Sequence, residues 1–484
     1  MLEAEDSKRE ENNMGNDRAC KEENRKIRAG LKNAKKIAGR GLAIGACAAL
    51  SLSAVSCKTG DYKHGKKGYY SQVDNGIQTE VRDQGGKGNC WAHATDDSLR
   101  TYYQIHFGKD VPFTVDDVVS ATYGPDKEEG LIVASPGQEN NVGGSAEWAV
   151  WSLSNGYNGY VLTEAMVFYD AIDGEQEHEA YIKPRVSRQQ IQEVIKNVGA
   201  VTCLVDASAG QCSSHGYMTI YDNEFADQGE DVLFPAGYFG HEAVIVGWDD
   251  HFPKEYFGKE YGKEPTKADG AWLMKDSDGT NAGNDGYFWV SYESAILPTM
   301  VLGISDQYSE VLSYEGGCPV GVRTGEVTTV ANVFHHEGTL SAVGTYVGMD
   351  ADIFCSFPFG TMDDTHIHIE IRDASMEKVL ATKEVSFDYE GYYVVELDEP
   401  IEVSDFSVVI SYNATAPIEA VDPDDLEEEG HGGHRVNYIS GIEPGQSFIY
   451  LSGQWMDLAD EKTQQALGLL YPTNNCCIKA LFAK

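Results

Sequence analysis

A glycine-rich turn that runs directly into a helix constrains this chain more than any other stretch. Residues 82–94 read Arg-Asp-Gln-Gly-Gly-Lys-Gly-Asn-Cys-Trp-Ala-His-Ala. Apolar residues from Trp91 to Tyr103 recur at helical spacing, which predicts that Cys90 stands in the first turn of a helix. Free backbone N–H groups and the positive end of the helix dipole favour a thiolate there and lower the pKa of the thiol. Cys90 is therefore a candidate nucleophile.

Gln84 lies six residues before this cysteine and carries a neutral amide donor. The glycine-rich turn can fold the amide back toward the thiol, where an oxyanion forms during acyl transfer. The alternative interpretation is that Cys90 is a buried structural cysteine, which is the usual environment of a free thiol. The coincidence of Gln, several glycines and Cys-Trp-Ala at one spacing favours the nucleophile.

These residues resemble the signature of the papain-like cysteine peptidases, which have a Gln, a Gly-rich turn and Cys-Trp-Ala, followed much later by a His and an Asn. The resemblance extends over about residues 68–300. It implies an α+β papain-like two-lobed catalytic domain with Cys90 as nucleophile and Gln84 as the side-chain donor to the oxyanion. His241, which begins the buried-strand pattern of residues 241–248, would be the general base and acid.

The third catalytic position departs from the family pattern. Residues 275–279 read Lys-Asp-Ser-Asp-Gly where the family usually has Lys-Asn-Ser-Trp-Gly. We expect Asp276 to orient His241 with a carboxylate in place of an amide, and its negative charge to favour the imidazolium. Asp278 replaces a Trp that shields this contact from water in the family. We therefore expect a wetter site in which the charge interaction is weaker.

Gly144, within the run Asn-Val-Gly-Gly-Ser at residues 141–145, is the candidate for substrate binding. In the resembled family a comparable glycine pair lines the cleft and its backbone bonds an extended substrate. A turn that starts a helix is the alternative.

Residues 276–287 resemble a calcium-binding loop, but Asn281 and Tyr287 stand where an EF-hand has Gly and Glu. We expect no metal site, and the mechanism requires no cofactor.

The other histidines outside this pattern are interpreted as structural or surface residues. His93 follows the cysteine by three helical residues, which turns it away from the exposed side of the thiol, so we expect it to pack beneath the site. His366 and His368 alternate with isoleucines and are predicted to lie on the solvated face of a strand. His431 and His434 lie in an acidic stretch, and a surface loop is favoured over a weak metal site there.

The first 57 residues read as a targeting segment. Basic residues within 32–40 precede the uncharged run 41–56, which is too short and too rich in small residues to favour a permanent membrane span. The run ends in Ser-Ala-Val-Ser-Cys, which resembles a bacterial lipoprotein signal with Cys57 as the lipidated residue. A plain secretory signal and an uncleaved anchor are the alternatives. All three imply a location outside the cytoplasm, either at the outer face of the cell membrane or secreted.

We divide the chain into four segments: a targeting segment 1–57, a polar spacer 58–67, a peptidase domain 68–303 and a second domain 304–484. Only 32 residues separate Cys57 from Cys90, so we expect no long inhibitory segment between them.

Short alternating strands separated by turns predict that the last segment, residues 304–484, is an all-β sandwich. Stretches such as 331–334 and 455–458 resemble the lectin-like module found in some bacterial papain-like peptidases. Carbohydrate is a candidate partner, to be stacked on exposed Trp or Tyr, with core packing of these rings as the alternative.

Charge and cysteine content narrow the possible partners. The chain has a formal charge of −40, and residues 58–484 contain 26 basic and 69 acidic residues, a formal charge of −43. Such a surface repels nucleic acid, so nucleic-acid binding is excluded, whereas polypeptide substrates are compatible with it. Six cysteines remain outside the targeting segment and the site (Cys203, Cys212, Cys318, Cys355, Cys476 and Cys477), and their spacing does not determine a pairing. The oligomeric state is left open.

The sequence therefore predicts a lipid-anchored or secreted cysteine-type endopeptidase, which hydrolyses peptide bonds through a Cys-His thiolate–imidazolium pair and a covalent acyl-enzyme. Two alternatives stay open. The first is an extracellular binding or adhesion protein whose peptidase-like domain has lost turnover. The second is a thiol acyltransferase or transpeptidase, which passes the acyl group to an amine in place of water.

Overall fold

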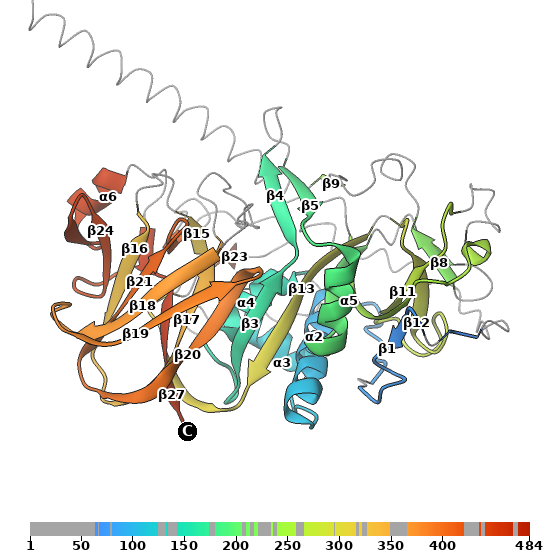
Figure 1. Cartoon of the computed structure of the whole chain (residues 1–484), viewed down its shortest axis with the longest axis horizontal. Helices are drawn as coiled ribbons and strands as arrows, with labels where there is room; N and C mark the ends of the chain where they lie inside the picture. The colour runs from blue at the N-terminus through green and yellow to red at the C-terminus, as the bar shows by residue number, and fades with distance from the viewer. Residues whose placement is uncertain are drawn as a thin grey trace, which may run out of the picture.

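The structure is a computed structural model of the whole chain, shown in Figure 1. It describes residues 63–65, 67–77, 80–123, 132–133, 143–173, 180–205, 210–212, 217–220, 234–235, 240–257, 266–294, 296–315, 319–321, 327–348, 365–420, 435–436, 441–467 and 473–484. The targeting segment with Cys57, and also His431 and His434, lie outside these ranges. Within them, no helix is both long enough and apolar enough to cross a membrane.

The helices of the first domain pack beside its sheet and are set by clear local signals. They are α2 (Cys90–Phe107), α3 (Val115–Thr122), α4 (Ala146–Leu153) and α5 (Arg188–Asn197). Thr114 and Ser187 each close a capping box at the start of a helix, with Asp117 and Gln190 as partners. Gly108 ends α2 in the left-handed conformation, with φ of 66°. The predicted helix that starts at Cys90 is confirmed.

A mainly antiparallel sheet, in which only β8 pairs in parallel with β12 among the described strands, forms the second part of this domain. Strands β6, β10, β11 and β12 are hydrogen-bonded in that order, with β1 on the edge of β10 and β13 and β3 continuing beyond β6. The strands of this region are β1 (Tyr69–Ser71), β3 (Val161–Val167), β6 (Val201–Val205), β10 (His241–Asp249), β11 (Ala271–Lys275), β12 (Tyr287–Ser291) and β13 (Ile296–Ser305), with the shorter β2 (Ile132–Val133), β4 (Tyr169–Asp173), β5 (Ala180–Pro184), β7 (Gly210–Cys212), β8 (Tyr217–Ile220) and β9 (Phe234–Pro235), and the 3-10 turn η2 (Lys254–Tyr256).

The C-terminal half is built from antiparallel sheets that pack face to face. Strands β19, β18, β21, β16, β24 and β25 form one sheet, and β14, β27, β17 and β20 lie against it around a shared apolar core. Its elements are β14 (Tyr308–Leu312), β15 (Pro319–Gly321), β16 (Thr329–Phe334), β17 (Gly338–Val347), β18 (Thr365–Asp373), β19 (Val379–Phe387), β20 (Glu390–Val403), β21 (Phe406–Tyr412), β22 (Pro417–Ala420), β23 (Arg435–Val436), β24 (Ser447–Leu451), β25 (Gln454–Asp457), α6 (Glu461–Leu467), β26 (Thr473–Cys476) and β27 (Ile478–Ala483). The predicted fold class, an α+β domain followed by an all-β sandwich, is confirmed. His366 is exposed and the His368 side chain is 39% exposed, as the alternation predicts.

The two halves share one sheet, which the sequence did not lead us to expect. Strand β20 of the C-terminal half pairs antiparallel with β3 of the first domain, so a single sheet of thirteen described strands crosses the junction (Figure 1). Tyr346 and Tyr392 from the C-terminal half also belong to the same apolar core as Trp91 and Leu99 of α2. The predicted boundary at residue 303 falls inside β13, which continues to Ser305.

Gly391 lies where β20 meets β3 and has φ of 143°. A Cβ at this position would lie 1.8 Å from the carbonyl oxygen of Ala165. We expect Gly391→Ala to lower the free energy of unfolding by about 2–4 kcal/mol, because it adds a backbone clash to the strain of the backbone conformation. Thermal and denaturant unfolding measure this loss. Gly445→Ala is the matched control, since Gly445 also has a positive φ but open space around it; equal losses in the two variants would contradict the importance of the β20–β3 contact.

Candidate active site

Cys90 is the first residue of α2 and is buried. No acidic side chain lies in the first turn of this helix to offset the positive end of its dipole. Burial by itself would raise the pKa of the Cys90 thiol, but the charge of His241 and a hydrogen bond with it, together with a backbone hydrogen bond from Glu242, outweigh burial and lower the pKa. The surroundings of Cys90 therefore favour its thiolate form.

His241 and Asp276 meet because β10 and β11 are antiparallel neighbours, which brings the start of the first beside the end of the second. The Nε2 atom of His241 lies 2.8 Å from Oδ1 of Asp276, and this oxygen also accepts a hydrogen bond from the backbone N–H of Ser277 at 2.7 Å. With Nε2 facing the carboxylate, Nδ1 is the ring nitrogen left for the thiol of Cys90. The histidine thus lies between a thiol and a carboxylate.

Neighbouring charges outweigh burial in setting the pKa values of His241 and Asp276. Burial lowers the pKa of His241, but Asp276 and Cys90 raise it by a larger amount, and the net pKa lies well above the ordinary value. Burial raises the pKa of Asp276, but the charge of His241 and the hydrogen bond with it reverse the sign, and the net pKa is lowered. The three shifts favour the thiolate, the imidazolium and the carboxylate together.

The contact of His241 with Asp276 is better shielded than the sequence suggested. The two side chains are only 12% and 11% exposed. We expected a wetter site because Asp278 stands where the resembled family has a Trp, and the structure differs from that expectation. Asp278 is itself half-buried, and burial and the nearby charge of Asp276 raise the pKa of its carboxyl.

Gln84 is held beside this group by hydrogen bonds to the segment that follows Asp276. Its backbone N–H donates to the carbonyl of Ser277 at 2.7 Å, and its Oε1 accepts from the hydroxyl of Ser277. Its Nε2 donates to the carbonyl of Lys87 at 2.7 Å. The amide is therefore oriented, with its oxygen engaged and its nitrogen carrying a second N–H.

Gly144 lies just before α4, with Ser145 as the N-cap, so the turn that starts a helix is present. Its φ of 150° is unfavourable for other residues, and a Cβ there would lie 2.3 Å from the indole of Trp91. The indole of Trp91, the residue after Cys90, thus packs directly on Gly144. The role of Gly144 in substrate binding stays a prediction.

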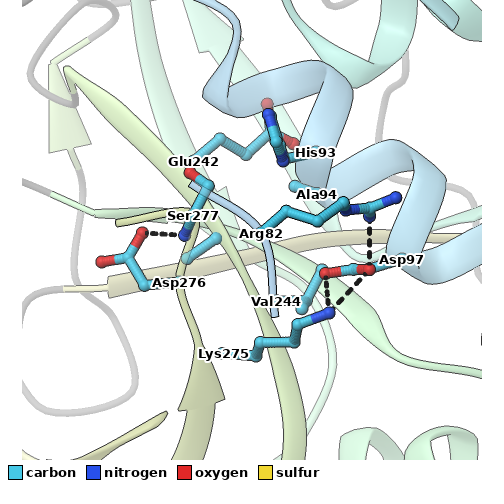
Figure 2. Close-up of a pocket in the computed structure, with 10 residues that line it drawn as sticks. Arg82, His93, Ala94, Asp97, Glu242, Val244, Lys275, Asp276 and Ser277 are labelled. Atoms are coloured by element: carbon cyan, nitrogen blue, oxygen red, sulfur yellow. Dashed lines mark hydrogen bonds and ion pairs between the residues drawn. The ribbon is translucent and has the colours of Figure 1, made fainter. Parts of the chain in front are cut away.

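His93 lies beneath the site, as its helical position suggested. It lines a small cavity together with Glu242 and Asp276, and Figure 2 shows these side chains. Burial and the charge of Arg82 lower the pKa of His93 to about 4, so it is neutral at physiological pH. A neutral imidazole does not compete with His241 for the thiolate.

Two groups of buried charges near the site were missed by the sequence reasoning. Glu242 and Glu147 are buried carboxyls whose pKa values are raised by burial. Asp97 joins Arg82 and Lys275 in ion pairs behind the site. The available signal was Glu242, an acidic residue inside an otherwise apolar strand pattern, and no comparable signal marked Asp97.

A thiolate paired with an imidazolium, a carboxylate behind the ring and an oriented amide beside them define a cysteine hydrolase site on an α+β fold. Residues 69–309 match the model of the papain family cysteine protease, and residues 316–482 match the lectin like domain. The chain is a papain-family cysteine protease domain followed by a lectin-like domain.

Curated relatives agree with this family. Cathepsin S of Bos taurus is 24% identical over 231 residues, which cover 46% of this chain and 59% of the relative. Procathepsin L of Rattus norvegicus is 21% identical over 227 residues, covering 45% of this chain and 58% of the relative. The chain therefore spans less than three fifths of the length of these relatives.

A solved structure has a similar fold across both domains. It contains the cysteine protease and lectin-like domains of Cwp84, a surface layer associated protein of Clostridium difficile. It is 16% identical and covers 88% of this chain and 90% of its own, with a TM-score of 0.58. A second structure, of a variant of the clostridial cysteine protease Cwp84 after propeptide cleavage, is also 16% identical, covers 85% of this chain and 98% of its own, and gives a TM-score of 0.56. At this identity the likeness shows the fold.

Replacing Asp276 by Asn tests how the carboxylate acts on the histidine. Asp276 raises the pKa of His241, so its loss lowers that pKa and the imidazolium gives up its proton at a lower pH. We expect Asp276→Asn to keep much of the activity and to move the alkaline limb of the kcat/KM profile down by about 1 pH unit or more. Asp285→Asn, an exposed residue of the same loop, is the control. An unchanged rate and an unchanged profile would remove Asp276 from the site.

Proposed function

We propose that this protein is a cysteine endopeptidase in which Cys90 and His241 perform the chemistry, Asp276 orients the ring and Gln84 stabilises the oxyanion. The observation that carries the proposal is the position of His241 between the thiol and the carboxylate, 2.8 Å from Asp276. Polypeptides are the substrates, and the acyl group passes to water.

The reaction follows from the protonation states at the site. The Cys90 thiolate attacks the carbonyl carbon of the scissile bond, and the oxygen gains a negative charge. One N–H of the Gln84 amide donates to Lys87, so the second is available for this oxygen, together with the backbone N–H of Cys90. The imidazolium of His241 then gives its proton to the leaving amine as the C–N bond breaks.

Water completes the cycle. The neutral imidazole of His241 takes a proton from water, and the resulting hydroxide attacks the acyl-enzyme. The thioester bond breaks and Cys90 leaves as a thiolate, which restores the ion pair with His241. The negative charge of Asp276 stabilises the imidazolium at the beginning and at the end of the cycle.

A peptide-library digest with product masses tests the proposed activity. The intact chain should cleave internal peptide bonds, Cys90→Ala should abolish cleavage, and Gln84→Ala should lower kcat about 100- to 1,000-fold because an oxyanion donor is lost. Gln189→Ala, an exposed glutamine of α5, is the matched control. Covalent labelling of Cys90 without any cleavage would indicate a binding protein instead. Products extended by an added amine would indicate transpeptidation.

Carbohydrate is the proposed partner of the lectin-like domain. Tyr450 and Trp455 are cross-strand partners in the β24–β25 hairpin, with ring centroids 5.2 Å apart in an edge-to-face arrangement, and Tyr450 is 42% exposed. Aromatic rings that present an open face suit stacking against the apolar face of a sugar.

Affinity electrophoresis with a panel of soluble polysaccharides tests this partner. The intact chain should be retarded by at least one polysaccharide, and Trp455→Ala should no longer be, because one of the two aromatic rings that stack on the sugar is removed. Val379→Ala changes an exposed apolar residue of the same domain and should leave the retardation unchanged. Equal retardation of the Trp455 variant and the intact chain would contradict the assignment.

The proposed location is the outer face of the cell, with a lipid on Cys57 as anchor. The lipoprotein-like sequence at residues 53–57 supports it. The similar fold of Cwp84, which is a surface layer associated protein, is consistent with it.

A further inference from the structure

Asp97 lies on the same helix as Cys90 but serves no step of the proposed reaction. It follows the cysteine by seven residues, close to two helical turns, so both residues lie on one side of α2. Its side chain is only 7% exposed. A buried carboxylate needs charged or polar partners to offset the loss of water.

Two cations from two different segments supply those partners. Nη2 of Arg82 lies 2.7 Å from Oδ1 of Asp97, and Nζ of Lys275 lies 2.9 Å from Oδ1 and 2.8 Å from Oδ2. Figure 2 shows the carboxylate between the guanidinium and the ammonium. Lys275 is 2% exposed, and burial lowers its pKa while Asp97 acts in the opposite direction.

Each cation adjoins a residue of the proposed machinery. Arg82 precedes Gln84 by two residues, and Lys275 immediately precedes Asp276. Nζ of Lys275 also donates to the carbonyl of Glu80 at 2.8 Å, which adds a bond between the same two segments. Through these cations Asp97 contacts the segment that contains Gln84 and the last residue of β11, immediately before Asp276.

Backbone hydrogen bonds join the two segments to each other, whereas the side chain of Asp97 joins them to α2. The segments containing Gln84 and Asp276 are already bonded to each other, through the backbone N–H of Gln84 to Ser277 and of Gly279 to Arg82 at 3.1 Å. Asp97 joins this pair of segments to the helix that carries the nucleophile. A second carboxylate on α2, Asp96, assists by pairing with Arg82.

We propose that Asp97 is a positioning residue for catalysis, which holds Gln84 and Asp276 in register with Cys90 by binding Arg82 and Lys275. The inference rests on the proposed function for the roles of these residues. Loss of the Asp97 charge weakens the connection of α2 to Lys275 and leaves Asp96 as the partner of Arg82 on this helix, so the amide and the carboxylate shift relative to the thiol. Ground-state binding of a peptide depends less on this register than does the transition state.

Asp97→Asn tests the proposal, because it keeps the shape of the side chain and removes its charge. Rates are expressed per active site titrated with an irreversible thiol reagent, so that misfolded molecules do not count. We expect kcat to fall about 10- to 100-fold with KM changed less than about threefold, since a misplacement of about 1 Å costs up to about 100-fold. Affinity for a peptide aldehyde, whose hemithioacetal oxygen occupies the oxyanion position, should fall by a similar factor.

A measurement without substrate distinguishes this proposal from the proposed function. The pH dependence of Cys90 alkylation by iodoacetamide reports the thiolate and the state of His241. Asp97→Asn should move its alkaline limb to lower pH, because a displaced Asp276 no longer raises the pKa of His241. In an Asp276→Asn background the same change should move the limb no further. These results are expected even if the intact chain does not cleave peptides.

Asp110→Asn is the matched control, since Asp110 is 65% exposed and pairs with a different cation of α2, Arg100. It should leave kcat, aldehyde affinity and the alkylation profile unchanged. A thermal denaturation midpoint that falls for Asp97→Asn while all three readouts stay within twofold of the intact chain would overturn the proposal in favour of a purely structural ion pair.

Arg82→Lys keeps the test decisive if Asp97→Asn does not fold. Lysine retains the charge but lacks the fork that reaches both Asp96 and Asp97. A fall in kcat of at least about fivefold per titrated site, with KM little changed, is the expected result. A kcat within twofold of the intact chain would overturn the proposal.

Discussion

The buried ion pair between Cys90 and His241 is the constraint on which the site depends. Burial alone would push both groups toward their neutral forms, raising the pKa of the thiol and lowering that of the imidazole. Each charge compensates the other, and Asp276 adds a second anion on the far side of the ring. Because a buried charge without a partner is strongly destabilising, the pair must form as one unit or not at all.

The fold supplies the three groups from separate elements. A helix start provides the thiol, the beginning of β10 provides the imidazole, and the end of β11 provides the carboxylate. Antiparallel pairing fixes the last two relative to each other. The buried Asp97 of the helix adds a side-chain connection to the segments that carry Gln84 and Asp276. The same sheet continues through β3 into β20, so the lectin-like domain shares backbone hydrogen bonds with the catalytic one.

Local signals explain how much the sequence could predict. The glycine-rich turn before Cys90, the capping residues Thr114 and Ser187, and the alternation of the later strands each act within a few residues, and the corresponding elements are present. The pairing of β20 with β3 joins residues more than two hundred positions apart, and no local pattern sets such a register. The partners of Asp97 were likewise hidden, because an acidic residue on a helix reads as exposed until the fold buries it. The shielding of Asp276 also depends on tertiary packing. The sequence predicted a wetter site, because Asp278 stands where the family has a Trp.

Ultraviolet absorbance of the thiolate tests the ion pair most directly, taken as the difference between the intact chain and Cys90→Ala across a pH titration. An unperturbed thiol ionises near a pKa of about 8.5. The account predicts a thiolate signal that is already present well below that pH and that moves toward the unperturbed value when His241 is replaced by Ala. A signal that appears only at or above the unperturbed value in the intact chain would contradict it.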